Sequence, residues 1–293
     1  SSARTLMYSL CWALAAPASA RPPLTSLLLT TRNPSPRGDA LAAPPSWQTV
    51  AMLLEACSST APLLHAMHLA LALAQQLAGR MAPPRRVVML TCGVLACGGA
   101  PSDAAHGGAW GFARVLRLEH AALRTQSAGV SCETLLAARC IWLAPTAEAE
   151  VAWTGESHVV VARLRACTTA STATASLAAG AYAITGGLGG LGLRAAAMLV
   201  QIGASGIALS SRSGRVGGRA IDAAKGALVR VAACDVGDAA DTLALLACAA
   251  STSVLHAAGV LHDKMLRSMA TNDAHAVFAP KALGASHVQT IVM

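Results

Sequence analysis

The sequence predicts an α/β protein that contains a doubly wound parallel sheet in its C-terminal half. Three observations carry this prediction. After residue 180, short apolar runs alternate with longer segments whose apolar residues recur at helical spacing, as in proteins that wind helices over a parallel sheet. The first run is joined to a helical segment by a turn with five glycines among its eight residues, 185–192. The chain of 293 residues is also long enough for two ordinary domains.

The composition indicates a folded protein and argues against several function classes. Hydrophobic residues make up 54% of the chain and charged residues 12%, which is incompatible with intrinsic disorder. The formal net charge is +8, but the 22 lysines and arginines form no run and no aromatic residues are interleaved with them, so we expect no nucleic-acid partner. Nine cysteines without a CxxC pair indicate neither a metal site nor a disulfide framework. Reduced thiols and a cytoplasmic location fit this pattern.

The apolar stretch Leu6–Ala20 has two interpretations. It follows Arg4 and ends in Ala-Ser-Ala, as a secretory signal does. Alternatively it is an opening β-strand, because Tyr8, Leu10 and Trp12 alternate along it. We favour the strand, since the sequence has no initiator methionine and its cysteine usage argues against export. No apolar window reaches the ~18 residues that a membrane span needs, so we expect no membrane partner.

The N-terminal half contains five predicted elements in order. A stretch rich in proline, serine and glycine predicts a loop, and apolar residues at helical spacing then predict one or two helices. A short apolar run predicts a buried strand, and an amphipathic segment predicts a further helix with Trp110, Ala113 and Leu116 along one side. Two apolar runs around Thr-Gly-Glu predict a β-hairpin. These elements occupy residues 30–46, 47–79, 85–93, 109–120 and 149–166.

A Ser/Thr/Ala-rich stretch without periodicity, residues 167–180, is the best candidate for a domain linker. The second half then predicts strands over 181–185, 206–212, 228–236 and 253–259, and helices over 192–203, 238–250 and 275–288. Because strands and helices alternate, these strands are expected to form a parallel sheet.

The glycine turn is typical of dinucleotide-binding sites. Glycines 186, 190 and 192 fit a GxxxGxG spacing, and 186, 189 and 192 also fit GxxGxxG. Such a turn lets the backbone adopt positive φ and approach a pyrophosphate, whose charge then lies at the amino end of the following helix. The strand–turn–helix context favours nucleotide binding over a merely flexible turn. The residues predicted to line the site are Thr185, Gly186, Gly187, Leu188, Gly189, Gly190, Leu191 and Gly192.

The end of the next strand indicates which nucleotide binds. An NAD site usually places an acidic residue ~20 positions further on, to bind the ribose 2′-hydroxyl. Residues 193–221 contain no Asp or Glu. Ser211, Arg212 and Ser213 stand there instead, a cation and two hydroxyls suited to a 2′-phosphate. The cofactor is therefore predicted to be NADPH, and the alternative is that Arg212 is a surface arginine at a strand end.

Two later strand ends add candidate contacts. Asp235 could accept a hydrogen bond from the adenine amino group, and Val236 could cover a face of the ring. Asp235 could instead cap the next helix, a role that Asp238 could also fill. Small residues after the fourth strand would let the ribose approach the backbone, although the histidine among them could simply be packed. This last set comprises His256, Ala257, Ala258 and Gly259.

Together these segments resemble the NADPH-dependent ketoreductase domain of modular polyketide synthases, in the short-chain dehydrogenase/reductase superfamily. In the second half the resemblance rests on YAITGGLGGLG, SRSG, VAACDV, LHAAGVLHD and APKALGA. In the first half it rests on Tyr8-x-Leu10-x-Trp12, AWGFARVLRLEH and EVAWTGESHVVVARL. The resemblance implies two Rossmann-like units: a truncated structural subdomain over 1–166, a linker over 167–180, and an NADPH-binding catalytic subdomain over 181–293 that is incomplete at its C-terminus.

The resemblance also implies an activity and partners. The domain would use NADPH to reduce a β-ketoacyl thioester that phosphopantetheine tethers to an acyl carrier protein, among neighbouring synthase domains. In the family, a lysine in a Pro-Lys context acidifies the tyrosine that protonates the substrate oxygen, and this lysine matches Lys281. Asp263 matches the aspartate associated with B-type stereochemistry. Animal fatty acid synthases carry a similar domain.

Three departures from the family pattern affect these expectations. His262 replaces the first residue of the family's acidic pair, and the piece from 214 to 227 is short. The family's catalytic serine and tyrosine lie beyond the helix that holds Lys281, whereas this chain ends there and has only Tyr8 and Tyr182. We therefore expect a C-terminally truncated ketoreductase that is inactive alone. The alternative is a non-catalytic structural or NADPH-binding module of a polyketide or fatty acid synthase.

Overall fold

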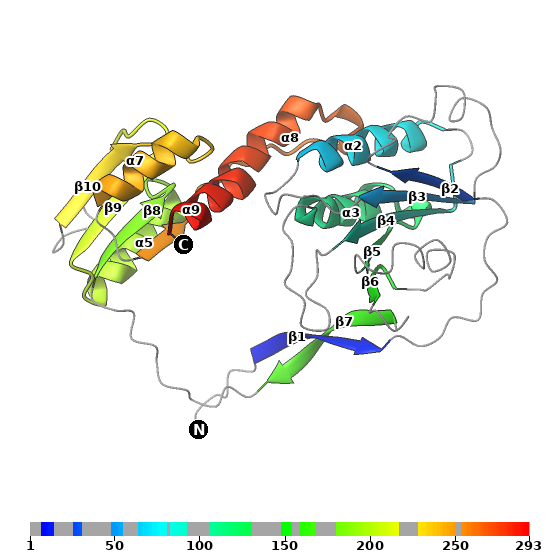
Figure 1. Cartoon of the computed structure of the whole chain (residues 1–293), viewed down its shortest axis with the longest axis horizontal. Coiled ribbons are helices and arrows are strands. Elements are labelled where there is room, and N and C mark those ends of the chain that lie inside the picture. The colour runs from blue at the N-terminus through cyan, green and yellow to red at the C-terminus, as the bar shows by residue number, and fades with distance from the viewer. Residues whose placement is uncertain are drawn as a thin grey trace. The chain divides into compact units, whose positions relative to one another are not determined.

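The computed structural model describes residues 7–14, 26–30, 48–54, 64–80, 83–92, 106–130, 148–153, 159–167, 180–216, 228–249 and 253–292. The chain divides into two compact units, whose elements are labelled in Figure 1. The first comprises Ser1–Ala170 together with Lys264–Met269, and the second comprises Ser171–Asp263 together with Ala270–Met293. The predicted linker over 167–180 lies outside the described residues except at its two ends.

The first unit contains a seven-stranded sheet in the order β1-β7-β6-β5-β4-β3-β2. Strands β2 to β6 pair in parallel, whereas β7 pairs antiparallel with both β6 and β1. The predicted opening strand, buried strand and hairpin strands are confirmed as β1, β4, β6 and β7. The strands span Met7–Leu14 (β1), Ser26–Thr30 (β2), Thr49–Leu54 (β3), Arg86–Cys92 (β4), Gln126–Val130 (β5), Glu150–Trp153 (β6) and Val159–Cys167 (β7).

Strand β3 corrects a sequence prediction. Helical spacing predicts helices throughout residues 47–79, but Thr49–Leu54 form a strand, and the helix described in this range is α2, Leu64–Ala78. All six side chains of β3 are buried. A strand that is covered on both faces has a continuous apolar sequence, which periodicity alone does not distinguish from a buried helix. The sequence patterns also do not predict β2 and β5.

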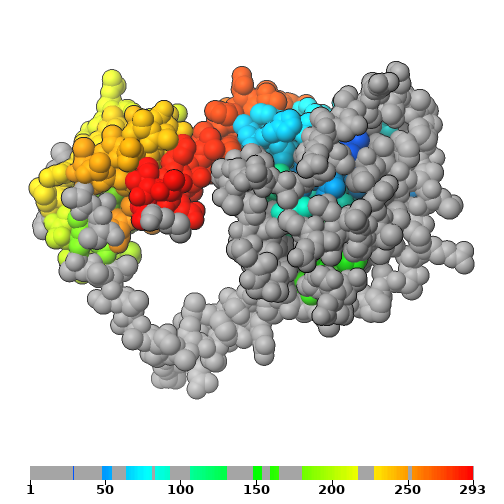
Figure 2. Space-filling model, in the orientation of Figure 1, coloured from blue at the N-terminus to red at the C-terminus, as the bar shows by residue number. Residues whose placement is uncertain are grey.

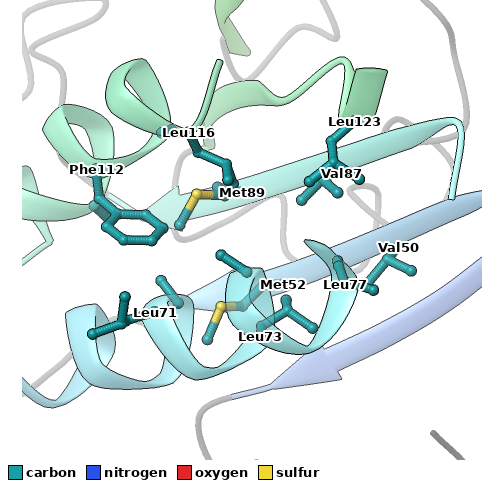
Figure 3. Packing of buried hydrophobic residues seen from close by; sticks show 14 of the residues in the cluster. Val50, Met52, Leu71, Leu73, Leu77, Val87, Met89, Phe112, Leu116 and Leu123 are labelled. Carbon is teal, nitrogen blue, oxygen red and sulfur yellow. The ribbon is translucent and has the colours of Figure 1, made fainter. Parts of the chain in front are cut away.

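Two apolar clusters lie on the two faces of this sheet. One includes residues of helices α2 and α3 (Gly107–Glu119). Successive side chains of a strand point to opposite faces, so Met52 of β3 joins this cluster, whereas Ala51 and Leu53 join the other. In Figure 3, side chains of α2 and α3 converge on Met52 and Met89.

Helix α3 confirms the predicted amphipathic helix and is also linked to the sheet by polar contacts. Trp110 is 5% exposed, and its Nε1–H donates to Thr91 Oγ1 at 2.8 Å. Arg114 and Arg117 donate to Glu150 of β6 at 2.7 and 2.6 Å. The hydrogen bond from Arg114 and the charges of both arginines hold the pKa of Glu150 below its ordinary value. The helix is thereby fixed to two strands, β4 and β6.

A short segment from the C-terminal half completes the first unit. Leu266, in the 3-10 turn η3 (Leu266–Ser268), is 2% exposed and belongs to the cluster formed with α2 and α3. Its N–H donates to Glu119 Oε2 at 2.8 Å, and Gln75 Nε2 donates to the carbonyl oxygens of Leu266 and Met269, each at 2.9 Å. These contacts join residues 147 to 194 positions apart, so local sequence patterns do not predict them.

The second unit contains four parallel strands in the order β10-β9-β8-β11. The predicted α/β fold with a parallel sheet is confirmed. Its strands span Ala181–Thr185 (β8), Gly206–Ser211 (β9), Leu228–Ala233 (β10) and Ser253–His256 (β11), and its helices span Gly190–Gln201 (α5), Ala239–Ala249 (α7), Thr271–Phe278 (α8) and Gly284–Val292 (α9).

The predicted helix over 275–288 is divided in the structure. A π-helical turn, η4 (Ala279–Leu283), separates α8 from α9. Helix α9 packs against α7, and the two helices adjoin on the face of this unit that Figure 2 shows. In the described part of the chain, no helix has both the length and the apolarity that crossing a membrane requires.

Candidate functional site

The glycine turn lies at the carboxyl end of β8, an inner strand of the second unit's sheet. Strand β8 pairs with β9 on one side and with β11 on the other, so the order of the strands along the chain reverses beside it. Open α/β sheets bind ligands in the crevice outside the carboxyl ends of the strands at such a reversal. Because all four strands are parallel, the predicted contact residues after β9, β10 and β11 lie along this same edge.

Three glycines of the turn are required by close backbone packing. Gly186 has a φ of +66°, and a Cβ built on it would lie 2.6 Å from the Cα of Ala258. A Cβ on Gly187 would lie 2.6 Å from the carbonyl oxygen of Ile184, and one on Gly192 would lie 2.6 Å from the Cα of Gly187. Side chains at these positions would displace the backbone. The turn therefore packs closely against the residues that follow β11, and the first residues of α5 pack closely against the turn.

The amino end of α5 is open, in contrast to the packed part of the turn. Gly189 is the N-cap, has no side chain to cap the helix, and is exposed. A Cβ on Gly190 would meet nothing within 4 Å, and the side chain of Leu191 is 80% exposed. The first amides of a helix have no intrahelical acceptor, and the helix dipole is positive there. The polarity and openness of this helix end fit the pyrophosphate of a dinucleotide.

Strand β9 brings Ser211, Arg212 and Ser213 to the same edge. Ser211 Oγ accepts a hydrogen bond from the N–H of Gly214 at 3.1 Å, and Gly214 has a φ of +60°, so the chain turns sharply after the strand. Arg212 and Ser213 are exposed. Among the residues that the structure describes, no carboxylate forms an ion pair with Arg212. The guanidinium is therefore available to an anionic ligand.

The structure distinguishes the two aspartates that could cap α7. Asp238 Oδ1 accepts hydrogen bonds from the N–H groups of Ala240 and Asp241, at 2.8 and 3.0 Å, so Asp238 is the cap. Asp235 precedes it with an exposed carboxylate, whose Oδ1 accepts from the N–H of Gly237 at 3.0 Å. The contact of Asp235 with adenine stays a prediction that this exposed position allows.

Val236 and Cys234 are buried beside this aspartate. Val236 is 5% exposed, and its carbonyl oxygen accepts hydrogen bonds from Thr242 Oγ1 and His287 Nδ1, at 3.2 and 3.1 Å. Its predicted contact with adenine stays untested. Burial, together with the nearby carboxylates, raises the pKa of the Cys234 thiol, so it is a poor nucleophile. No group of three or more metal-ligating side chains occurs among the described residues.

His256, at the end of β11, contacts protein groups through both ring nitrogens. Its Nδ1 lies 2.7 Å from Thr185 Oγ1, and its Nε2 lies 3.3 Å from the carbonyl oxygen of Lys281. The next residue, Ala257, donates its N–H to the carbonyl oxygen of Thr185 at 3.0 Å. These contacts match the interpretation of His256 as a packed histidine. The sequence offered no signal for its connection to Lys281.

Lys281 lies in the turn η4 with an exposed side chain. Its stem passes over Gly259, because a Cβ built on Gly259 would lie 3.0 Å from Lys281 Cε. Gly259 directly follows Ala258, which packs against Gly186, so Lys281 and the glycine turn adjoin the same chain segment. π-Helical turns are frequent at functional sites. Sequence reasoning finds this lysine only through its Pro-Lys context.

Asp263, its neighbour His262 and Tyr182 are also singled out by the sequence. Asp263 is exposed, and its neighbour His262 lies with Nδ1 3.7 Å from Oδ1 of Asp273. Asp273 also accepts the N–H of Ala270 at 2.8 Å, at the start of α8. Tyr182 is 6% exposed and belongs to the apolar core of the second unit. It is therefore not positioned as an acid at the strand ends.

Comparison with known proteins gives relatives of one kind. Residues 180–293 match the family model of the KR domain. The chain is 30% identical over 217 residues to polyketide synthase GfsA of Streptomyces halstedii, and 42% identical over 118 residues to a mycocerosic acid synthase-like polyketide synthase of Mycobacterium tuberculosis. These matches cover 68% and 36% of this chain. The chain spans only 3% and 6% of those two relatives.

Solved structures of ketoreductases are similar over nearly the whole chain. A structure of A-type ketoreductases from a modular polyketide synthase superposes with a TM-score of 0.77 at 25% identity, covering 97% of this chain and 71% of that one. The ketoreductase from the first module of phoslactomycin biosynthesis in Streptomyces sp. HK803 superposes with a TM-score of 0.76 at 25% identity, covering 97% and 69%. Both units of the fold are therefore found together in these proteins.

Proposed function

Because the chain belongs to the ketoreductase domain family of polyketide synthases, we propose that it reduces a β-ketoacyl thioester to the β-hydroxyacyl thioester with NADPH. Its partners are an acyl carrier protein, which carries the substrate on phosphopantetheine, and the neighbouring synthase domains. One observation carries the proposal: an open glycine turn stands at the carboxyl end of β8, and Lys281 adjoins it through Gly259 and Ala258.

The strand ends of the second unit supply the groups that would hold NADPH. The first amides of α5 would face the pyrophosphate, where Gly190 leaves space for it. Arg212 would pair with the 2′-phosphate, since it is exposed and the end of β9 offers no carboxylate for a 2′-hydroxyl. Asp235 would accept a hydrogen bond from the adenine amino group. A charge-assisted contact of the Arg212 type contributes about 1.5–3 kcal/mol, enough to select NADPH over NADH.

The chemistry requires a proton donor beside Lys281. NADPH, when bound, supplies the hydride. Negative charge then builds on the substrate oxygen, which needs a hydrogen-bond donor within reach. In this family the donor is a tyrosine that the lysine acidifies, but neither Tyr8 nor Tyr182 matches the family's tyrosine motif, and Tyr182 is buried in the core. The 293-residue polypeptide is therefore expected to bind NADPH without reducing a substrate.

Reductase assays test this proposal. NADPH consumption with a β-ketoacyl thioester is measured at equal concentrations of this polypeptide and of a version extended by the family's serine- and tyrosine-bearing segment. The extended protein should turn over, the polypeptide should not, and Lys281→Met in the extended protein should lower the rate while NADPH affinity is retained. Comparable turnover from the two proteins would contradict the proposed roles.

Two outcomes of the same assays refine the proposal. If the extended protein binds NADPH but stays inactive, the chain is instead a non-catalytic NADPH-binding module. If it is active, chiral analysis of the β-hydroxy product tests the B-type outcome that the resemblance assigns to Asp263, and the opposite configuration rules that assignment out.

A further inference from the structure

The side chain of His256, in β11, connects strand β8 to the turn η4. This histidine ends β11, and its ring lies between the side chain of Thr185, at the end of β8, and the backbone of η4. The distances are 2.7 Å from Nδ1 to Thr185 Oγ1 and 3.3 Å from Nε2 to the carbonyl oxygen of Lys281. Thr185 is fully buried, so its hydroxyl is a fixed anchor for the ring.

Hydrogen-bond chemistry assigns the protons of this bridge. The carbonyl oxygen of Lys281 can only accept, so Nε2 of His256 must carry the proton that it donates. In the neutral ring Nδ1 is then an acceptor, and the hydroxyl of Thr185 donates to it. The ring is thus held in one tautomer and one orientation, with a different element on each side.

Two glycines leave the space that this arrangement needs. A Cβ built on Gly284 would lie 3.1 Å from Cε1 of His256 and 2.9 Å from Cγ1 of Val236, so a side chain there would press on the ring. A Cβ on Gly259 would lie 3.0 Å from Cε of Lys281. The ring of His256 therefore packs against Gly284, and the aliphatic part of the Lys281 side chain packs against Gly259. The backbone of η4 is held by the ring, and its lysine passes over the strand end.

We propose that His256 is a positioning residue for Lys281. Its Nε2–H holds the carbonyl of Lys281, and the buried hydroxyl of Thr185 holds its Nδ1, so that the π-helical turn keeps the lysine stem over Gly259. His256 acts through the protein, because both of its ring nitrogens contact protein groups. The function that Lys281 serves rests on the proposed reductase site, whereas the bridge itself is a property of the second unit without ligand.

Asparagine and glutamine substitutions of His256 distinguish its hydrogen bond with Thr185 from its hydrogen bond with the carbonyl of Lys281. The side-chain amide of Gln reaches about as far as Nε2 of histidine, whereas that of Asn reaches only about as far as Nδ1. His256→Gln should keep the bond to the carbonyl of Lys281, and His256→Asn should keep only the bond to Thr185. His275, an exposed histidine of α8, provides the matched control His275→Asn.

The readouts use the whole polypeptide without cofactor. Amide hydrogen exchange over residues 281–285, and the rate at which an amine-reactive acylating reagent modifies Lys281, are measured by mass spectrometry. His256→Asn should raise both by about three- to tenfold, since one hydrogen bond is lost. His256→Gln and His275→Asn should stay within about twofold of the unmodified protein. Equal rates in His256→Asn and the unmodified protein would overturn the proposal.

A spectroscopic signature covers the case in which the asparagine variant does not fold. Nitrogen-15 NMR of the unmodified protein should show a protonated Nε2 and a bare Nδ1 for His256. Thr185→Val removes the hydroxyl at nearly constant shape, and Nδ1 should then lose its hydrogen-bonded chemical shift. A protonated Nδ1 with a bare Nε2 would overturn the proposal, because that ring cannot donate to Lys281. Failure of the protein to bind NADPH would count against the proposed function and leave these results unchanged.

Discussion

Strands β4 and β8 are alike in their pairing and in a buried threonine, but the threonines have different hydrogen-bond partners. Each is an inner strand that pairs in parallel with both of its neighbours, and each carries a fully buried threonine close to its carboxyl end, Thr91 in the first unit and Thr185 in the second. Thr91 is bonded to the indole of Trp110, a bulky residue in the first turns of α3. Thr185 is bonded to His256, and the residues that follow it are the glycine turn.

The difference lies in what fills the space next to the helix that follows each strand. In the first unit the N-cap of α3 is His106, which is 4% exposed, and Trp110 packs nearby at 5% exposure. In the second unit the N-cap of α5 is the exposed Gly189, and no atom lies within 4 Å of where a Cβ on Gly190 would stand. Among the described residues, the amino end of α3 is therefore packed with buried side chains, whereas that of α5 is open, and the assignment of a ligand to α5 rests on this local difference and not on the fold.

The largest expected effect comes from Gly192→Ala, which tests whether the second unit depends on its packed turn. The new Cβ would lie 2.6 Å from the Cα of Gly187 and 2.7 Å from the carbonyl oxygen of Gly186, so the turn must move. NADPH affinity measured by calorimetry should fall about 10- to 100-fold, equal to about 1.4–2.8 kcal/mol.

The first unit supplies the matched control for this variant. Gly111 is also a helical glycine, but a Cβ on it would meet nothing within 4 Å. Gly111→Ala should therefore leave NADPH affinity unchanged and stabilise α3 by up to about 1 kcal/mol, because alanine favours a helix more than glycine does. Equal NADPH affinities of Gly192→Ala and the unmodified protein would show that the turn is not the binding element.

A smaller effect is expected for Trp110→Phe in the first unit. The substitution removes the Nε1–H that Thr91 Oγ1 accepts and leaves a buried hydroxyl without that donor. The free energy of unfolding in urea should fall by about 1–2 kcal/mol, with NADPH affinity unchanged. Adding Thr91→Val should cause little further loss, because removing both partners of a buried hydrogen bond is less costly than removing one. A drop in NADPH affinity would contradict the claim that this hydrogen bond stabilises the first unit without affecting cofactor binding.

The smallest effect is expected for Glu150→Gln, which probes the ion pairs of the first unit. The pKa of Glu150 is held below its ordinary value of 4.5 by Arg114 and Arg117, so the ionised carboxylate stabilises the fold at neutral pH. That stabilisation is lost as the pH falls through the lowered folded-state pKa. The variant should lose less than about 1 kcal/mol at neutral pH and show a weaker dependence of unfolding free energy on acid. An unaltered pH dependence would show that the pairs contribute nothing.

Sequence reasoning recovered the parts of the second unit whose signals are local. The glycines predict the turn after β8, and the apolar spacing predicts α7, although contacts are needed to choose Asp238 over Asp235 as its cap. It was wrong for β3, because a strand buried on both faces has no period-2 pattern to read. It missed Leu266 in the first unit's core, since that contact depends on tertiary packing. Lys281 emerged only from the resemblance, and its link to His256 only from the structure.

Calorimetric titration with NADPH and with NADH tests most directly whether the open turn of the second unit binds a phosphorylated dinucleotide. NADPH should bind about 10- to 100-fold more tightly, because Arg212 adds a charge-assisted contact worth about 1.5–3 kcal/mol. Arg212→Ala should abolish this preference without weakening NADH binding. Arg267→Ala removes the same charge from an exposed position in the first unit and should preserve the preference. Equal affinity of the unmodified protein for the two cofactors would contradict the assignment of Arg212 and of the site.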